Sequence, residues 1–462
     1  MALHADVVWE VRTTGSDNNG GGFKSSAGGT DRSQQAASHA TLSAASLVNA
    51  TTTIIDVAAG DYTCTDDDVG NILQIHGGTA TAGLYEITAR SSQQWTLDRS
   101  AGTVGQTVVG DMGGCFASPG KLSDAIQTDN QRAHIKSGTY TLTTTTAGAA
   151  GKLLLSASIA CRIEGYDATR GDLTAKAYHS DSDNRPVMDV AALTSFNVVE
   201  TDSQFDSSRQ AIYCLEVDGK SNSSINGFYL DGGYGGGYGF RLKAKNCTQG
   251  ILRGELLECF ADNCSTYGMK PSAQCIRCYA VDCTTGYYPD ASSKVFMAHC
   301  IADTCTTGFT NNNSFNNIYT HCLAVDCTGD GFKMDKYSGM DFLSYCLAYG
   351  CGGWGFEMEK SSHIDQFMFC CAGGSNTSGD VTPSVLLGND GFVTLTADPF
   401  TNKAGKDFTP NTTAGGGAEI SGIVKTATQA NDNGDVGAAQ HADPAGGGGG
   451  LLRVGMTGGM HG

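Results

Sequence analysis

The chain has 462 residues, including 63 Gly and 8 Pro, and only 16% of its residues are charged. This turn-rich composition is typical of β proteins and argues against a helical protein, in which Ala, Leu, Glu and Lys would dominate. Asp and Glu outnumber Lys and Arg by 47 to 29, which gives a formal net charge of -18 and disfavours a nucleic-acid partner.

The first residues carry no targeting pattern that we recognise. They lack a basic segment followed by an apolar one, so we expect no secretory signal and predict folding in a reducing cytosol. No run of 18 apolar residues occurs, so we expect no membrane span.

Composition divides the chain into four regions. Residues 1–46 contain one alternating segment and an extended arm, and residues 47–112 form a small β module of short apolar segments between Gly-rich turns. Residues 113–441 form the main domain, and residues 442–462 are a Gly-rich tail. The arm and the tail are poor in apolar residues, so we expect both to become ordered on neighbouring subunits.

Residues 259–372 repeat a short unit. A Cys is followed by Ala two positions later, then by a second Cys, a Gly and usually an aromatic residue. Successive first cysteines lie 19 to 24 residues apart, at Cys259, Cys278, Cys300, Cys322 and Cys346, with a decayed copy at Cys370. Internal repeats of this kind indicate a solenoid with one small unit per period.

The period selects the class of solenoid. Helical repeats need about 34 to 45 residues and two helices each, and the leucine ladder of leucine-rich repeats is missing. We therefore predict an all-β protein whose main domain is a parallel β-helix, with successive coils about 4.8 Å apart.

Side-chain alternation predicts which residues face the interior. With the first Cys of each unit inward, the Ala two positions later is inward as well. After the Gly-aromatic corner, Phe332 and Phe356 fall on the inward parity, and Lys333 and Glu357 fall on the outward one. Residues of the same kind are therefore expected to stack on one another in successive coils.

Residues 113–441 resemble the right-handed parallel β-helix proteins of the pectate-lyase-like superfamily, particularly those of bacteriophage virions. The resemblance rests on Asp-Ala-Ile at 124–126, His-Ile-Lys-Ser-Gly-Thr-Tyr at 134–140, and the segments 398–400, 405–408 and 434–440. The arm, the β module and the tail are similar to flanking pieces of phage structural proteins, and this similarity alone implies a place in the virion, after synthesis in the host cytoplasm.

The repeated cysteines are predicted to form a core ladder. Small polarizable thiols suit a narrow, buried column. Disulfides, which would need an oxidising environment, and a metal site at the isolated Cys275 and Cys278 pair are the alternatives. We expect no metal and no cofactor. The predicted ladder comprises Cys259, Cys264, Cys278, Cys283, Cys300, Cys305, Cys322, Cys327, Cys346 and Cys351.

A column of outward residues is apolar, and apolar outer columns usually mark contact surfaces. Two covers are possible: the interface of a homo-oligomer, most simply a trimer of β-helices, or a loop or the C-terminal segment of the same chain. The predicted interface residues are Phe260, Tyr279, Ile301, Leu323 and Leu347, with Cys371 next in the series.

A second outward column lies just ahead of the inward cysteines. It includes His299 and His321 one coil apart, which could share a metal or a proton but more simply form surface. The whole column is Glu258, Arg277, His299, His321, Tyr345 and Phe369.

Candidates for catalysis are few. Asp335 and Glu359 lie one coil apart on the outward parity, which would place their carboxyl groups about 5 Å apart, as in retaining glycosidases. Any two stacked acids would share this spacing. We therefore predict no catalytic residue and keep these two only as candidates.

The expected function is a non-enzymatic virion structural protein, such as a head decoration, fibre or tail component, that assembles as a homotrimer and contacts other virion proteins through the arm and the tail. A polysaccharide depolymerase or lyase is the alternative. It would require a carboxylate pair or an Arg- or Lys-assisted base in an aromatic-lined groove. A non-catalytic adhesin for host glycan would use Tyr234, Tyr238, Tyr287 and Tyr288 as stacking platforms.

Overall fold

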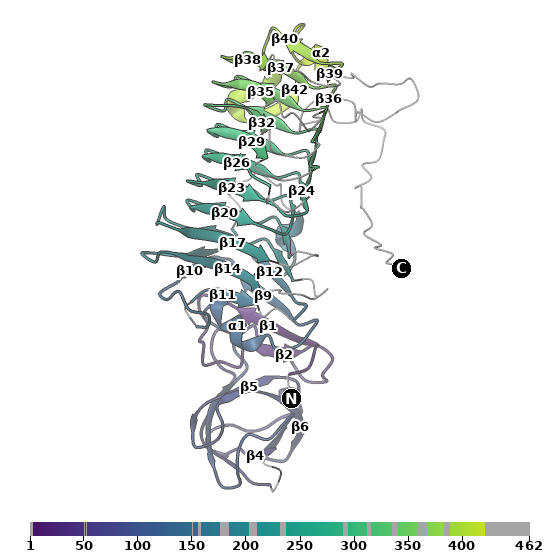
Figure 1. Cartoon of the computed structure of the whole chain (residues 1–462). Coiled ribbons are helices and arrows are strands. Elements are labelled where there is room, and N and C mark those ends of the chain that lie inside the picture. Colours follow the sequence, from purple (N-terminus) through teal and green to yellow (C-terminus); the bar gives the residue numbers. More distant parts are fainter. Residues whose placement is uncertain are drawn as a thin grey trace, which may run out of the picture.

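The protein is described here from a computed structural model, which covers residues 3–49, 51, 53–149, 151–155, 159–175, 184–202, 210–231, 237–289, 294–311, 316–334, 341–358, 367–382 and 389–420. A stack of β coils rises from a small barrel at one end (Figure 1). The predicted fold class is confirmed: the chain is all-β and its main domain is a right-handed parallel β-helix.

Each coil contributes one strand to each of three sheets, which we number 1 to 3. In the described residues, sheet 1 contains β2 (Gly22–Lys24), β1 (Val7–Val11), β9 (Arg132–Lys136), β12 (Arg162–Tyr166), β15 (Ala211–Tyr213), β18 (Tyr238–Phe240), β21 (Glu255–Leu257), β24 (Gln274–Ile276), β27 (Phe296–Ala298), β30 (Ile318–Thr320), β33 (Phe342–Ser344), β36 (Phe367–Phe369) and β39 (Asn389–Asp390). Apart from the antiparallel β2, its strands are parallel.

Sheet 2 follows sheet 1 along each coil. It contains β10 (Gly138–Thr141), β13 (Pro186–Asp189), β16 (Glu216–Asp218), β19 (Lys243–Lys245), β22 (Phe260–Asp262), β25 (Tyr279–Val281), β28 (Ile301–Asp303), β31 (Leu323–Val325), β34 (Leu347–Tyr349), β37 (Ala372–Gly374) and β40 (Val393–Leu395).

Sheet 3 completes each coil. It contains β11 (Leu153–Leu155), β14 (Phe196–Asp202), β17 (Ile225–Asp231), β20 (Gln249–Leu252), β23 (Tyr267–Lys270), β26 (Thr285–Tyr287), β29 (Thr307–Asn311), β32 (Phe332–Met334), β35 (Trp354–Met358) and β38 (Gly379–Val381).

Helices are short and peripheral. They are η1 (Asp66–Asp68), η2 (Pro119–Lys121), α1 (Leu122–Ala125), η3 (Asp172–Ala175), η4 (Lys403–Gly405) and α2 (Gly417–Ile420). Within the described ranges, none of these helices has the length and apolar character needed to cross a bilayer.

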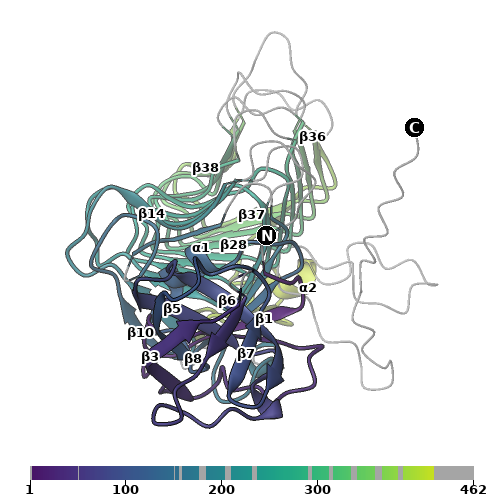
Figure 2. The same ribbon diagram turned by 90° about the horizontal axis from the view of Figure 1, so that it is seen from below.

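The small β module is a closed barrel that lies across the end of the coil stack (Figure 2). It is formed by β3 (Ala40–Leu47), β4 (Ile54–Asp56), β5 (Ile72–Gly78), β6 (Gly83–Ser91), β7 (Gln94–Leu97) and β8 (Thr107–Met112). The barrel therefore begins within the predicted arm rather than at residue 47, because β3 supplies the strand that closes it between β4 and β8.

The rest of the arm also differs from expectation. Strand β1 pairs in parallel with β9 and so belongs to the β-helix, because Val7, Trp9 and Val11 are fully buried in its core. Farther along, the Asn19 amide donates to the carbonyl oxygens of Ala36 and Cys115. The described part of the arm is thus packed on its own chain, and its contact with neighbouring subunits stays a prediction.

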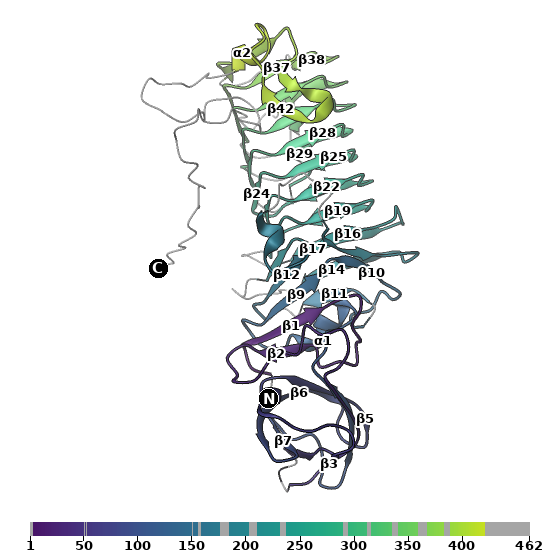
Figure 3. The ribbon, with the colours of Figure 1, turned by 180° about the vertical axis from the view of Figure 1, so that it is seen from behind.

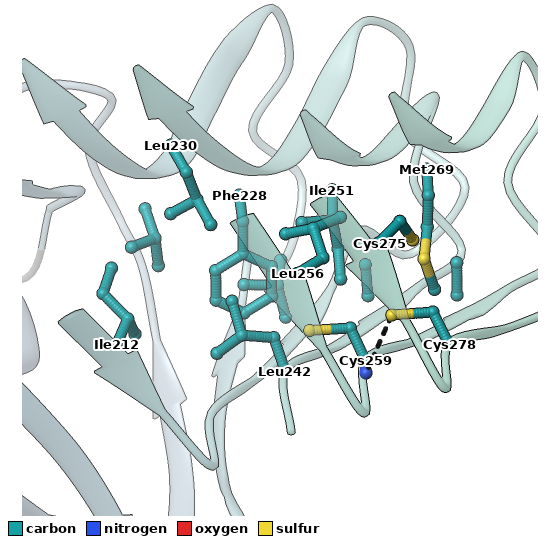
Figure 4. Close-up of a cluster of buried hydrophobic side chains, with 14 of the residues drawn as sticks. Ile212, Phe228, Leu230, Leu242, Ile251, Leu256, Cys259, Met269, Cys275 and Cys278 are labelled. Atoms are coloured by element: carbon teal, nitrogen blue, oxygen red, sulfur yellow. Dashed lines mark hydrogen bonds between the residues drawn. The ribbon is translucent and has the colours of Figure 1, made fainter. Parts of the chain in front are cut away.

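The predicted ladder cysteines all lie in the core, and all 18 cysteines of the chain are free and buried. Their thiols donate weak hydrogen bonds to carbonyl oxygens of the preceding coil, as from Cys300 to Cys275 at 3.2 Å and from Cys305 to Ala280 at 3.7 Å. Such a donor explains why Cys suits these columns as well as Ala does. Figure 4 shows the earlier coils of this core, with side chains from Leu230, Leu242, Leu256, Cys259, Met269, Cys275 and Cys278 pointing inward.

Aromatic rings form a second internal ladder beside the cysteines. The ring of Phe332 lies between those of Phe309 and Phe356, with centroids 4.6 and 4.8 Å away. Tyr287 begins the stack at 4.6 Å from Phe309. All four side chains are fully buried, so each coil packs one ring on the ring of the next.

The register predicted for the sixth repeat is wrong by one residue. Leu347 pairs with Ala372, so Cys371 rather than Cys370 follows Cys346 in the ladder, and Ala372 rather than Cys371 continues the outward column. Cys370 instead occupies the left-handed corner (φ 48°) that Tyr345 (φ 54°) occupies one coil earlier, which displaces Phe369 from that column. A shift of one residue reverses the inward and outward faces of a strand.

Candidate functional site

A polar cavity of about 650 Å³ opens on the outer face of sheet 2, and we call it the sheet 2 cavity. Strands β10 to β22 present their outward residues there, since Val187, Glu216 and Lys243 are partners in register on successive strands. Its lining residues are Ser137, Gly138, Thr139, Asn184, Arg185, Val187, Glu216, Lys243, Lys245 and Asp262.

Two cations of the sheet 2 cavity are nearly buried. Arg185 is 7% and Lys243 is 8% exposed. The Lys243 ammonium lies 3.7 Å from the Glu216 carboxylate and 5.5 Å from the ring centroid of Phe260. The Arg185 guanidinium donates to the carbonyl oxygen of Arg241. These contacts hold both charged groups in place, which lowers the entropic cost of binding a polar ligand.

Acids complete the sheet 2 cavity. Asp262 pairs in register with Lys245, and burial raises the pKa of Asp262 although Lys245 and Lys243 lower it. The lining thus offers three cations, two carboxylates, an amide and hydroxyl groups in one hollow. Such a set can bind the hydroxyl and carboxylate groups of a saccharide.

A second candidate lies on the outer face of sheet 1, at its first coils. Glu10, His134, Glu164 and Tyr213 are partners in register on β1, β9, β12 and β15. We call this set of side chains, with the arginines beside it, the His134 face. No sequence pattern selects this face, because these coils lack the Cys repeat.

His134 is neutral at physiological pH. Burial, followed by the charges of Arg170, Arg162 and Arg132, lowers the pKa of His134 to about 4. Its Nδ1 atom is buried and has no hydrogen-bond partner among the residues that the structure describes. A neutral imidazole can accept a proton, although a pKa of about 4 makes His134 a weak base.

Other groups of the His134 face are firmly paired. The fully buried Glu10 carboxylate accepts hydrogen bonds from Arg12 at 2.8 Å, from Arg170 at 2.7 Å and from the Tyr166 hydroxyl. Arg162 contacts Glu164 at 3.1 Å. These pairs fix the arginines in position around the imidazole.

Aromatic rings border the His134 face. The Arg162 guanidinium lies over the Tyr213 ring at 4.3 Å, and Tyr213 contacts Tyr238 at 5.8 Å and Phe240 at 5.7 Å. These side chains supply the Arg-assisted base and the aromatic rings of the sequence-based lyase alternative, which also required a groove.

The predicted apolar column lies under a segment of the same chain over much of its length. Residues 396–420, which we call the strap, include β41 (Phe400–Asn402) and β42 (Asp407–Pro410) and lie against sheet 2 (Figure 3). In the column, Leu323 and Leu347 are 1% and Tyr279 is 6% exposed, whereas Phe260 and Ile301 are half-buried.

Aromatic and ionic contacts hold the strap in place. Phe400, Phe408 and Ile420 pack in the same cluster as the column. Lys403 binds Asp326 at 2.8 Å, and Lys406 binds Asp303, which also accepts from the Tyr279 hydroxyl at 2.5 Å. Of the two covers that the sequence left open for the apolar column, the structure shows the C-terminal segment of the same chain. The homotrimer stays a prediction.

The other residues predicted to act in catalysis or in glycan stacking either have structural roles or lie outside the residues that the structure describes. Asp335, Glu359 and Tyr234 fall outside the described residues. Lys333 and Glu357 face outward and form an ion pair at 2.6 Å. Tyr287 points into the core and so is no exposed stacking platform, because its ring stacks on Phe309.

The two column histidines lie on the surface as stacked rings. The centroids of His299 and His321 are 4.9 Å apart, and His321 stacks on Tyr345 at the same distance. Within the described part of the chain, no group of three or more His, Cys, Asp or Glu side chains could hold a metal ion.

Comparison with known proteins gives similarity in fold. The sequence matches no protein-family model and no curated protein. Among solved structures, it is similar to pectate lyase Pel9A, with 14% identity, a TM-score of 0.34 and coverage of 56% of this chain and 70% of that one. The periplasmic alginate epimerase AlgG shows 12% identity, a TM-score of 0.30 and coverage of 57% and 76%. The Azotobacter vinelandii mannuronan C-5 epimerase AlgE4 A-module shows 12% identity, a TM-score of 0.30 and coverage of 60% and 76%.

Proposed function

We propose that this protein is a non-enzymatic structural component of a bacteriophage particle, a head decoration, fibre or tail protein, and that its β-helix binds host-surface glycan at the sheet 2 cavity. The observation that best supports glycan binding is the pair of nearly buried cations, Arg185 and Lys243, which line the sheet 2 cavity on the side of the coil stack. The place in the virion rests on the resemblance of the flanking segments to phage structural proteins.

Several features of the coil stack support a structural role. Three hydrogen-bonded ladders run the length of the coil stack, and the barrel covers one end of it. Continuous ladders with stacked cores make a stiff rod whose coils stabilise their neighbours.

Assembly as a homotrimer belongs to the same proposal. Phe260 and Ile301, half-buried beside the strap, are the column residues left to contact another copy, and sedimentation velocity would test this assembly.

Glycan binding is tested with variants of the sheet 2 cavity. The double variant Lys243→Ala and Lys245→Ala should weaken binding to the glycans that the wild-type protein selects on an array by tenfold or more. Lys243 is nearly buried and Lys245 is part-exposed, and a hydrogen bond to a charged group contributes about 1.5 to 3 kcal/mol. Calorimetry with the selected glycan measures the loss. Lys333→Ala, which removes an exposed lysine from sheet 3, is the matched control and should bind as the wild type does. Equal binding by the double variant would refute the site.

A second function is favoured by the His134 face. We infer that His134, neutral among arginines, can remove the C5 proton of a uronate while Arg162 or Arg132 stabilises the carboxylate. The 4-linked oxygen then departs and takes a proton from water, which leaves a C4–C5 double bond. The same array glycans would then be cleaved, with ultraviolet absorbance from the unsaturated product. His134→Gln would abolish that absorbance and Lys333→Ala would not. Binding without any cleavage by the wild type would refute the lyase and leave the adhesin.

A further inference from the structure

The outer face of sheet 1 is apolar in its later coils. Six large apolar side chains are exposed in the described part of the chain, and four of them lie on this face: Phe296 (37%), Ile318 (42%), Phe342 (41%) and Phe369 (39%). Phe296, Ile318 and Phe342 are partners in register on β27, β30 and β33, and Phe367 follows Phe342 on β36. We call Phe296, Ile318, Phe342 and Phe367 the sheet 1 column.

Aromatic rings extend this apolar surface to one side. His299, His321 and Tyr345 directly follow β27, β30 and β33, and their rings stack along the coil stack with centroids 4.9 Å apart. Phe369 packs edge to face on Tyr345 at 5.9 Å. The sheet 1 column and this row of rings together form one continuous strip across the coils of β27 to β36.

The strip also lacks charge in its strands. Strands β27, β30, β33 and β36 contain no acidic or basic residue. The first coils of the same sheet instead carry Arg132, Arg162 and Glu164. Because the chain has a formal net charge of -18, two copies repel each other where their acidic surfaces meet. The uncharged strip is therefore a face on which copies can approach at little electrostatic cost.

The strap does not account for this strip. Its anchors Phe400, Phe408 and Ile420 pack in the cluster on sheet 2, where Leu323 and Leu347 of the same coils are only 1% exposed. The sheet 1 column has no such cover among the described residues and stays about 40% exposed. Contiguous apolar surface of this kind marks a contact with another molecule.

The regular repeat of the strip favours a second copy as that molecule. Successive residues of the sheet 1 column lie one coil apart, about 4.8 Å. Another copy with a parallel coil stack presents the same side chains at the same heights, so every row can meet an equivalent row. A narrow column that faces a threefold axis also allows each side chain to contact its equivalents in both other copies.

We propose that three copies of the chain pack through sheet 1 with parallel coil stacks, so that their sheet 1 columns meet on a common axis. This contact rests on the homotrimer of the proposed function, and it moves the interface from Phe260 and Ile301 to sheet 1. A specific interface buries about 800 Å² per partner. The strip supplies its apolar core, and the polar residues of neighbouring coils supply its rim.

Sedimentation velocity of the full-length protein tests this contact. The wild type should sediment as a trimer. Ile318→Lys should sediment as a monomer at the same concentration, because three ammonium groups would be brought together in an apolar interface. Val104→Lys is the matched control, since Val104 lies between β7 and β8 of the barrel and is 57% exposed, and it should stay trimeric. Circular dichroism verifies that both variants keep the fold.

Chemical cross-linking provides a second measurement that leaves the interface intact. Ile318→Cys adds one exposed thiol to a chain whose 18 native cysteines are buried. Because equivalent side chains meet at the common axis, a short bismaleimide should link two copies of Ile318→Cys into a covalent dimer on a denaturing gel. The wild type and Val104→Cys should give no such dimer.

Every other outcome decides against the sheet 1 contact. Trimeric Ile318→Lys, or absence of the covalent dimer from Ile318→Cys, would overturn it. Monomers from Ile301→Lys together with trimers from Ile318→Lys would return the interface to sheet 2 and leave the homotrimer standing. A monomeric wild type would overturn the homotrimer and this contact together, whereas the Lys243→Ala and Lys245→Ala protein decides glycan binding separately.

Discussion

Replacing Phe332 with Ala should lower the free energy of unfolding by about 3 to 5 kcal/mol, the usual loss for a buried aromatic residue. The Phe332 ring is fully buried and stacks on rings from the coils before and after it, with interplanar angles of 5° and 8°. Its removal would leave a cavity in the middle of the ladder and weaken contacts on both sides. Urea unfolding, followed by fluorescence and circular dichroism, would measure the change.

The control for this variant is the next residue along the chain. Lys333 lies on the same strand but faces outward, and its ion pair with Glu357 is part-exposed. Lys333→Ala should therefore alter stability by less than about 1 kcal/mol. Similar losses from the two substitutions would mean that the assigned inward and outward faces of β32 are wrong.

Removing the two aromatic anchors of the strap should release it from sheet 2. Phe400 and Phe408 are each 5% exposed and pack edge to face, 5.4 Å apart, over the apolar column. In the double variant Phe400→Ala and Phe408→Ala, we expect protease cleavage within residues 396–420 to accelerate tenfold or more, because local opening controls the cleavage rate. Binding of a hydrophobic dye should rise as Leu323 and Leu347 become exposed.

Thr412→Ala is the matched control for the strap, since Thr412 is exposed on the same segment. It should be cleaved at the wild-type rate. If the double variant is cleaved no faster than this control, the aromatic anchors do not hold the strap. A rise in oligomer size together with dye binding would show that the uncovered column can also bind a second copy.

Much of the β-helix was predictable because the same pattern of inward and outward residues recurs in several coils. Cys, Ala and Phe recur at fixed offsets, so the alternation of one coil predicts that of the next. The prediction was off by one residue only at the sixth copy, where Cys370 and Cys371 are adjacent and the spacing gives two possible registers. Register there is set by pairing with β34, which the sequence alone does not specify.

The cover of the apolar column was not predictable from the repeat. The column is evident from Leu323 and Leu347, but Phe400 and Phe408 come from a segment without any repeat, and their position depends on where the chain turns back after β40. Pattern analysis shows that such a face must be covered and leaves the covering element open.

The candidate sites depended on long-range contacts even more strongly. The pKa of His134 is lowered by burial and by arginines at three different positions, and the carboxylate that holds Arg170 is Glu10 from the start of the chain. None of these pairings follows from local composition.

Counting reactive thiols tests most directly whether the coils stack in the assigned register. All 18 cysteines are free and buried, and burial raises the pKa of Cys115 to about 11 and of Cys161 to about 12, which keeps these thiols protonated and unreactive. The native protein should therefore react only slowly with Ellman's reagent, and in denaturant without reductant all 18 thiols should react. Rapid reaction of several thiols in the native state, or a smaller total after denaturation, would contradict the buried cysteine ladder and the β-helix built on it.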